Sequence, residues 1–244
     1  MVRLASGDRP DVLCLQELPV WSLSELGPWS GMTAVADVAR RPRIGPFPSS
    51  AELGRIVTEL NHGLFRSAFT GQANAILLGG ELRVLERRRV VLNSFRFRRA
   101  QARRLELGTV ARLAWRKERR ICQAVRIGRG DATLVLGNLH ATGSPDKRLA
   151  DAELLRAAVF LDGLARPGEA VLLCGDFNLS VDNSRTLASL LEPEWGFTGP
   201  TQTGVDHVLV RGLRAGAPER WPRERRSLDG RLLSDHAPIE REIE

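Results

Sequence analysis

Short apolar runs that end in polar side chains recur along the chain. The run "DVLCLQE" closes on Glu17, and "VLLCGDFN" closes on Asp176 and Asn178. Runs this short and this apolar are typical of buried strands. On extended backbone Asp176 and Asn178 point to the same side, and Phe177 between them points back toward apolar packing. The pattern predicts strands with polar ends, where open α/β sheets commonly place ligands, although "GDFN" by itself also fits a plain strand-end turn.

Helical and strand patterns alternate in groups. "PSSAELGRIVTELNHGL" predicts a helix with Ser49 and Glu52 spaced as a capping box, and with Leu53, Ile56, Val57 and Leu60 on one face. "SPDKRLADAELLRAAVFLDGL" predicts a second, begun by Ser144 and Pro145, whose apolar pattern passes through Leu155, Ala158 and Val159. A third, shorter helix is predicted in "SRTLASLLE".

The strand segments outnumber the helices. "ANAILL", "RVLERRRVVL", "VDHVLVRG" and "APIEREIE" read as strands, and "RRICQAVRIGRGDATLVLGNLHAT" reads as a hairpin around a Gly-Arg-Gly-Asp turn. Helices that fall between groups of strands favour an α/β fold in which two sheets pack face to face with helices outside them. At 244 residues, one domain over 1–244 is expected.

Composition places the chain among soluble globular proteins, with 43% hydrophobic and 27% charged residues. We find no apolar window long enough to cross a bilayer and no leader-type segment at the N-terminus as written, so a cytoplasmic protein is expected. Cys14, Cys122 and Cys174 lack any C-x-x-C spacing and are interpreted as buried free thiols.

The formal net charge is +7, and all basic residues except Lys117 and Lys147 are arginine. Codon composition is one explanation of this bias, and a functional cationic surface is the other; in either case a cationic protein attracts phosphate-bearing polymers and anionic lipid headgroups. The densest basic stretch is "RRVVLNSFRFRRAQARRLELG". It fits a half-buried strand with a solvated arginine face, or a surface whose guanidinium groups contact phosphate.

Further strand ends carry polar side chains. His140 ends "LVLGNLH", Asp206 and His207 begin "DHVLV", and Asp235 and His236 in "SDHAP" precede the last strand. A single histidine at a strand end is more often a structural hydrogen-bonding group. Because the pattern recurs at strand after strand, we interpret these side chains as one site assembled from many strand ends.

The residue types indicate phosphoester hydrolysis. Carboxylates such as Glu17 and Asp235 are hard oxygen ligands that suit Mg²⁺, and a histidine held by a carboxylate is a general base near neutral pH. A zinc site built from His140, His207 and His236 is an alternative, but H-E-x-x-H and close Cys or His pairs are lacking. A serine hydrolase is disfavoured because no G-x-S-x-G elbow is present.

With these residues in view, the chain resembles the endonuclease/exonuclease/phosphatase superfamily, the deoxyribonuclease I-like proteins. The resemblance runs from about Asp11 to the C-terminus through "DVLCLQE", "NLHAT", "GDFN", "VDHVLV" and "SDHAP", in family order. It implies a four-layer α/β/β/α sandwich of two packed, mainly antiparallel sheets with the site at one end. It also implies a Mg²⁺-dependent phosphoesterase, with Mn²⁺ as an alternative metal, that acts as a monomer.

The resemblance also implies a role for each site residue. Glu17 would bind the metal, and His236 would activate water, with Asp235 orienting it and contacting metal. His140 would stabilise the phosphorane or assist the leaving group. Asp176 would position the nucleophile or act as acid and base, and Asp206 would support a histidine. Asn178 would hold phosphate or a catalytic side chain, and Asn74 in "QANAIL" would lie near the substrate.

The resemblance departs from the family at the N-terminus. Family members open with a strand of the type L-x-V-x-T-W-N, whose Asn helps to bind metal, and then a helix. We expect that strand, its Asn and most of the helix to be missing, through a misplaced start, which we favour because the other motifs are intact, or through truncation. A signal or membrane segment would be lost with the same stretch.

Several function classes stay open for this chain. A phosphodiesterase with a nucleic-acid substrate is favoured, and phosphomonoester cleavage is kept beside it. A phosphoinositide- or sphingomyelin-type lipid phosphoesterase, and a catalytically impaired phosphate-binding module, are the alternatives.

Overall fold

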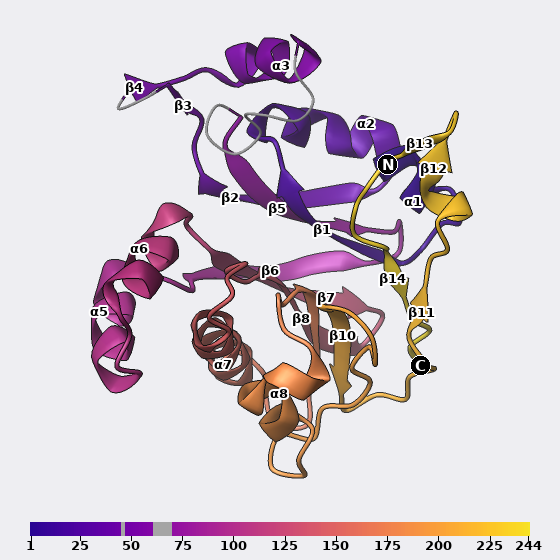
Figure 1. The fold of residues 1–244 in the computed structure, drawn as a ribbon. Coiled ribbons are helices and arrows are strands. Elements are labelled where there is room, and N and C mark those ends of the chain that lie inside the picture. Colours follow the sequence, from indigo (N-terminus) through magenta and orange to yellow (C-terminus); the bar gives the residue numbers. More distant parts are fainter. Residues whose placement is uncertain (45–46, 61–69) are drawn as a thin grey trace. The chain divides into compact units, whose positions relative to one another are not determined.

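The computed structural model of the protein describes residues 1–44, 47–60 and 70–244 (Figure 1). These residues form two compact units, Val2–Leu82 and Arg83–Glu244, the second of which also includes Met1. Each unit contains a sheet with helices on it, so the prediction of an α/β fold with mainly antiparallel sheets is confirmed. The single-domain assignment and the four-layer packing stay predictions.

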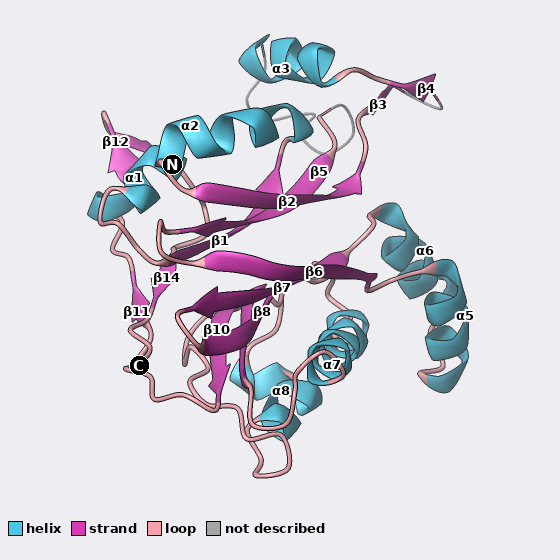
Figure 2. Cartoon of the chain, turned by 180° about the vertical axis from the view of Figure 1, so that it is seen from behind, coloured by secondary structure: helices cyan, strands magenta, loops and turns pink. Residues whose placement is uncertain are grey.

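The first unit is built on a three-stranded antiparallel sheet in the order β1-β5-β2. Helix α2 runs along one face of this sheet (Figure 2), where Leu26 packs with Ala75 and Leu77 of β5. The elements of the unit are α1 (Val2–Ser6), β1 (Val12–Leu18), η1 (Val20–Glu25), α2 (Leu26–Ser30), β2 (Thr33–Arg40), β3 (Arg43–Ile44), β4 (Phe47–Pro48), α3 (Ala51–Leu60) and β5 (Gln72–Leu78).

The second unit is built on a five-stranded sheet in the order β10-β9-β8-β7-β6, in which only the β8–β9 pair is parallel. Its main elements are β6 (Arg83–Val91), α5 (Phe95–Arg104), α6 (Thr109–Lys117), β7 (Ile121–Arg129), β8 (Ala132–His140), α7 (Arg148–Asp162), β9 (Ala170–Asp176), η2 (Val181–Asn183), α8 (Arg185–Leu190) and β10 (Asp206–Arg211). The C-terminal part adds β11 (Glu219–Arg220), η3 (Glu224–Arg226), β12 (Ser227–Leu228), β13 (Arg231–Leu232) and β14 (Ile239–Glu240).

Helices α7 and α8 cover one face of the five-stranded sheet (Figure 1). Leu154, Ala158 and Leu161 of α7 pack in one buried cluster with Leu173 of β9 and Leu187 of α8. The predicted hairpin is confirmed as β7–β8, which pairs Arg129 with Ala132 across a two-residue turn. This core fixes the carboxyl ends of β8 and β9, which point the same way because the two strands are parallel.

Several local predictions were wrong. Helix α7 begins at Arg148, because Ser144 and Asp146 close a turn before it: Ser144 Oγ accepts the Asp146 N–H and Asp146 Oδ1 accepts the Arg148 N–H. Leu155 and Val159 of α7 are exposed, and its buried face is centred on Leu154, Ala158 and Leu161 instead.

Helix α3 and the basic stretch also differ from expectation. The first turn of α3 is capped by Ser50, whose Oγ accepts the Leu53 N–H, rather than by Ser49. Leu53 and Ile56 are exposed, and the side chains of Val57 and Leu60 lie outside the described residues. The segment that begins "FRFR" is helix α5 and not a strand, because its period-2 alternation spans only four residues before helix-forming Arg, Ala and Gln residues take over.

All three cysteines are free thiols, of which Cys122 and Cys174 are buried and Cys14 is half-buried. In the part of the chain that the structure describes, no helix is long and apolar enough to span a bilayer.

Candidate active site

Three polar side chains occupy one row across the ends of three neighbouring strands. Asp176 ends β9, its register partner on the parallel strand β8 is His140, and its partner on the antiparallel strand β10 is Asp206. Paired residues on adjacent strands have Cβ atoms about 5 Å apart. The sheet register itself therefore brings together three of the side chains that the sequence suggested.

The "GDFN" segment turns sharply after the strand. Gly175 has φ 132°, and a Cβ on it would lie 1.9 Å from the Leu139 carbonyl oxygen, so only glycine fits this close approach. Phe177 is fully buried in the α7–α8 core, and Asn178 adopts a left-handed φ of 52°. Apolar anchoring of Phe177 thus fixes the polar residues on either side of it.

Asn178 folds back onto Asp176. Its backbone N–H donates to Asp176 Oδ1 at 2.8 Å, and its Nδ2 donates to Asp176 Oδ2 at 3.1 Å and to the Ala141 carbonyl at 3.1 Å. Lys147 Nζ donates to the Asn178 carbonyl at 3.0 Å. Asn178 therefore binds both oxygens of Asp176 and orients its carboxylate, whereas a plain strand-end turn would need neither bond to that side chain.

Asp206 holds the histidine of the "SDHAP" motif. His236 Nδ1 lies 2.9 Å from Asp206 Oδ2 and 3.1 Å from Oδ1. This bond to Asp206 raises the pKa of His236 to about 9, with further support from Asp176 and Asp235. Asp176, Asp206 and His236 each offer a ligand atom, and these atoms all lie within 4.8 Å of one another. Two carboxylates and one imidazole of this spacing can hold a metal ion or a proton.

The Asp176 carboxyl group is harder to ionise than an ordinary aspartate. Burial, together with the negative charge of Asp206, raises the pKa of Asp176 to about 6. Near neutral pH the group therefore sits close to its own titration point, which is typical of carboxyl groups that exchange protons or bind cations.

His140 is buried beside Asp176 and is held by a residue that the sequence reading missed. Its Nε2 lies 3.4 Å from Asp176 Oδ2, and Arg120 Nη1 lies 2.8 Å from each ring nitrogen. Burial and the Arg120 charge lower the pKa of His140 well below its usual value. A neutral ring with its proton on Nε2 can accept from Arg120 at Nδ1 and turn its N–H toward Asp176.

Arg120 is itself locked in place. Its Nη2 donates to Glu118, its backbone N–H donates to Asn93 Oδ1 at 2.9 Å, and only 6% of the residue is exposed. Burying a guanidinium is costly unless it is paired, and the bonds to Glu118 and His140 offset that cost while they fix the His140 ring. No local sequence signal marked Arg120, because the sequence does not show that Arg120 of the Arg119–Arg120 pair is the buried one.

Glu153 is a second buried group that the sequence did not single out. It lies on α7, is fully buried, and accepts hydrogen bonds from Trp115 Nε1 at 2.6 Å and from the Thr142 N–H and hydroxyl at 2.7 and 2.8 Å. Burial raises its pKa. Thr142 follows His140 by two residues, so Glu153 fixes the backbone just beyond the site.

The remaining histidine and aspartate of the two "DH" motifs make other contacts. His207 is buried beside Phe177, accepts the Thr201 N–H at Nδ1 and donates from Nε2 to the Leu179 carbonyl. With both ring nitrogens used, it is a structural histidine, and the zinc alternative loses its third ligand. Asp235 is exposed, and its Oδ1 accepts the His236 backbone N–H at 3.2 Å, while the His236 ring is bonded to Asp206 instead.

Glu17 and Asn74 belong to the unit Val2–Leu82. Between the pairs Leu15–Ala75 and Leu18–Ala73, strand β1 has two residues, Gln16 and Glu17, where β5 has only Asn74. This is a β-bulge, and Glu17 takes a left-handed φ of 56° in it. Asn74 is 2% exposed, and its Nδ2 has no partner among the described residues. The bulge thus brings these two predicted site residues side by side. That Glu17 joins Asp176, Asp206 and His236 at one metal stays a prediction.

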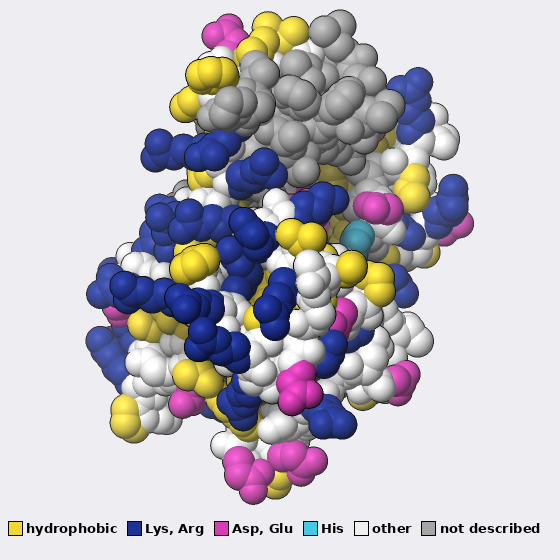
Figure 3. Space-filling view, turned by 60° about the vertical axis from the view of Figure 1, so that its left-hand side comes forward, with side chains coloured by type: hydrophobic (Ala, Val, Ile, Leu, Met, Phe, Trp, Pro, Cys, Tyr) yellow, Lys and Arg dark blue, Asp and Glu magenta, His cyan; other side chains and the backbone are white. Residues whose placement is uncertain are grey.

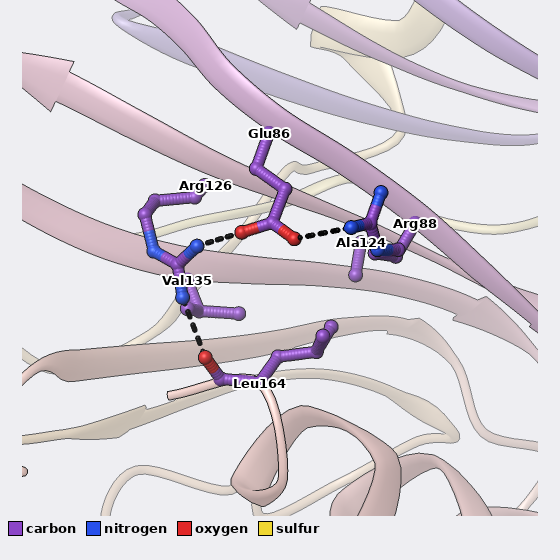
Figure 4. A pocket seen from close by; sticks show the side chains of 6 residues that line it. All are labelled: Glu86, Arg88, Ala124, Arg126, Val135 and Leu164. Atoms are coloured by element: carbon purple, nitrogen blue, oxygen red, sulfur yellow. Dashed lines mark hydrogen bonds and ion pairs between the residues drawn. The ribbon is translucent and has the colours of Figure 1, made fainter. Parts of the chain in front are cut away.

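A small pocket in the second unit lies away from the row (Figure 4). It is lined by Glu86, Arg88, Ala124, Arg126, Val135 and Leu164. Arg126 reaches Glu86, Glu169 and the Leu164 carbonyl, so an ion network fills the space. Val135 precedes His140 by five residues on β8, a separation of roughly 17 Å. The ion network ties neighbouring strands together, and no lining residue of the pocket belongs to the row of His140, Asp176 and Asp206.

Comparison with known proteins gives one family and a set of similar folds. Residues 2–236 match the sequence model of the Endonuclease/Exonuclease/phosphatase family. No curated protein matches the chain significantly.

Three solved structures illustrate the similarity of fold. A functionally unknown conserved protein from Enterococcus faecalis V583 is 16% identical with a TM-score of 0.65, over 100% of this chain and 90% of that one. Humanized D. rerio TDP2 is 14% identical with a TM-score of 0.66, over 100% and 91%. The mannosyl-6-phosphatase Bt3783 of Bacteroides thetaiotaomicron is 13% identical with a TM-score of 0.62, over 99% and 88%.

Proposed function

Because the chain belongs to the Endonuclease/Exonuclease/phosphatase family, whose members are hydrolases that act on phosphoesters, we propose that it is a metal-dependent phosphodiesterase. The observation that carries the proposal is the group Asp176, Asp206 and His236, whose ligand atoms lie within 4.8 Å of one another beside buried His140. Sheet register places Asp176 opposite Asp206, the glycine turn and buried Phe177 anchor the segment after β9, and the bond to Asp206 holds His236.

The donor set fits a hard divalent cation. Asp176 and Asp206 offer carboxylate oxygens, and Glu17 is proposed as a third oxygen ligand, whereas Cys122 and Cys174 are buried within strands β7 and β9. Such oxygens suit Mg²⁺ or Mn²⁺. Asp235, predicted from the sequence as a metal contact, remains a candidate beside His236. The bound ion would neutralise charge that develops on the phosphate oxygens and would favour the ionised form of both carboxylates.

His236 is the proposed general base. Asp206 fixes its Nδ1, which leaves Nε2 to take a proton from the attacking water. A pKa of about 9 means that the ring is protonated at neutral pH in the metal-free protein. Charge withdrawn from Asp206 by a cation lowers that pKa toward neutrality, because the Asp206 bond is what raises it. Turnover should therefore rise with pH until the His236 ring has lost its proton, at about pH 9 or, with the cation bound, at a lower pH.

His140, Asp176 and Asn178 complete the proposed mechanism. The N–H of neutral His140 donates to a phosphorane oxygen or stabilises the leaving group, and Arg120 keeps the ring in that orientation. Asp176 positions the nucleophilic water or exchanges a proton with it, and Asn178 holds the Asp176 carboxylate in one rotamer. Asn74 is proposed to contact the substrate from its own unit.

The substrate class rests on charge. A net charge of +7 favours a polyanion, and we propose nucleic acid as the phosphodiester substrate. Phosphomonoester cleavage is the second candidate, supported by the similarity of fold to a mannosyl-6-phosphatase. Lipid phosphoesters and a catalytically impaired phosphate-binding module are the remaining alternatives.

Assays of the purified protein on a panel of phosphoesters test the proposal. The panel contains bis-p-nitrophenyl phosphate, p-nitrophenyl phosphate, single- and double-stranded DNA, RNA, phosphoinositides and sphingomyelin. We expect turnover with Mg²⁺ or Mn²⁺, loss in excess EDTA, and a loss of about 10²-fold or more in His236→Ala and in Asp176→Asn. Asp131→Asn, an exposed acid in the β7–β8 turn, is the matched control and should retain full activity. Near wild-type turnover by folded His236→Ala, or rescue by zinc alone, would contradict the mechanism.

A further inference from the structure

The outward surface of helices α5 and α6 is strongly cationic. The exposed cations of α5 are Arg96, Arg99, Arg103 and Arg104, and those of α6 are Arg112, Arg116 and Lys117. Between Phe95 and Lys117 the only exposed carboxylate is Glu106. Figure 3 shows dark-blue side chains gathered on this face with yellow ones among them. The exposed residues of Phe95–Lys117 are called here the α5–α6 surface.

The inner side of the two helices is already satisfied. Ala102, Leu107 and Trp115 are buried with Leu149 of α7, and Phe97 packs edge-on against Trp115 at 6.0 Å between ring centroids. The core therefore uses one face of each helix, and the side chains on the other face do not contribute to folding through burial.

Large apolar side chains stand among the exposed cations. Phe95 is 69% exposed, Val110 82% and Leu113 57%. Val110 and Leu113 are three residues apart, so they lie on the same side of α6, with Lys117 one turn further along it. A helix face that combines exposed aliphatic side chains with flanking cations is typical of segments that lie in a bilayer interface.

We propose that the α5–α6 surface binds the surface of an anionic lipid bilayer. Phosphate and carboxylate headgroups would pair with the arginines, and Val110, Leu113 and Phe95 would enter the boundary between headgroups and acyl chains. Nucleic acid would satisfy the arginines equally well. It offers no apolar layer to aliphatic side chains, because bases stack on planar aromatic or guanidinium groups. The two exposed aliphatic residues therefore favour lipid, and the inference stands independently of the catalytic proposal.

Co-sedimentation of the full chain with vesicles tests the proposal. Phosphatidylcholine vesicles with and without 30% phosphatidylserine are compared at about 0.1 M salt, and a DNA duplex of mixed sequence is titrated in parallel. We expect the wild-type protein to partition onto the anionic vesicles only. R99Q/R103Q/R116Q should lower the partition coefficient about 100-fold, at roughly 5-fold for each cation. The control R214Q/R223Q/R231Q removes three exposed arginines from the C-terminal part of the unit and should lower it less than 10-fold.

The variant V110S/L113S separates lipid from nucleic acid. It keeps every charge, so it should lower partitioning onto anionic vesicles about 10-fold and leave the DNA affinity unchanged. Circular dichroism and turnover of a small soluble phosphodiester, expected to be unchanged, verify that each variant folds. Failure of wild type to bind anionic vesicles, equal losses in both arginine triples, or full vesicle binding by V110S/L113S would overturn the proposal. Full vesicle binding by V110S/L113S together with tight DNA binding would assign the α5–α6 surface to nucleic acid.

Discussion

His236 and Asp206 form a hydrogen-bonded pair, with Nδ1 of the imidazole 2.9 Å from Oδ2 of the carboxylate. The two residues come from separate motifs, and the register of β10 on β9 places Asp206 opposite Asp176. A single carboxylate therefore both orients the proposed base and borders the proposed metal ligand. Changes at Asp206 should alter the electrostatics of the whole site.

The first prediction concerns the titration of His236 in metal-free protein. Asp206→Asn should lower the pKa of His236 from about 9 toward its ordinary value of 6.5, because the bond to Asp206 is the largest cause of the shift. Asp235→Asn should lower it far less, since Asp235 contributes only through its charge. Two-dimensional NMR of the histidine ring protons measures both. A larger shift in Asp235→Asn than in Asp206→Asn would show that Asp235, and not Asp206, controls the base.

The same pair predicts how stability depends on pH. The folded-state pKa of His236 is raised from 6.5 to about 9, so the folded protein holds this proton more tightly than the unfolded chain. Its contribution to stability is fully present below pH 6.5 and is lost as the pH rises through 9. Thermal unfolding in EDTA should therefore show a decline across this window that is smaller in Asp206→Asn than in wild type.

Asp176→Asn should stabilise the fold above pH 6 while it removes activity. The pKa of the buried Asp176 is raised from 3.8 to about 6, so stability from its neutral form is present below pH 3.8 and lost as the pH rises through 6. The asparagine carries no charge and retains an acceptor for the Asn178 N–H; the bond from Asn178 Nδ2 is lost, which offsets part of the gain. We expect a gain of about 1–3 kcal/mol at pH 7 that disappears near pH 3.5, measured by urea unfolding in EDTA. A variant less stable than wild type at pH 7 would contradict this.

Arg120→Lys should lower kcat about 10- to 100-fold and leave KM nearly unchanged. Lysine lacks the planar fork that reaches both Glu118 and His140, so the His140 ring loses its fixed orientation. Arg119→Lys, at the exposed neighbouring position, is the control and should behave as wild type. A raised KM with unchanged kcat would instead assign Arg120 to substrate binding.

Gly175→Ala should destabilise the protein by at least about 3 kcal/mol. The new Cβ would overlap the Leu139 carbonyl oxygen, and φ 132° is unfavourable for alanine. Gly108→Ala, where a Cβ meets nothing within 4 Å and φ is −69°, is the matched control. Comparable unfolding midpoints for the two variants would show that the turn after β9 can relax without loss.

The sequence determined the local chemistry of this protein. Strand periodicity located β8, β9 and β10, because a buried strand requires a run of apolar residues. The polar residues that border each run marked the strand ends. The ordered motifs identified the family that residues 2–236 match. His140, Asp176, Asn178, Asp206 and His236 were all found in this way.

Only the tertiary structure decided which of these side chains meet. Asp206 rather than Asp235 holds the His236 ring. Successive side chains of a strand point to opposite faces of the sheet, so His207 turns into the core while its neighbour Asp206 lies at the site. Arg120 and Glu153 gain their importance from burial beside residues 20 and 11 positions away, contacts that no local pattern encodes. Within the basic stretch, Phe95–Arg104 forms helix α5, in which Phe97 and Ala102 pack against α6 and α7. This packing stabilises the helix, and the four alternating residues at its start do not reveal it.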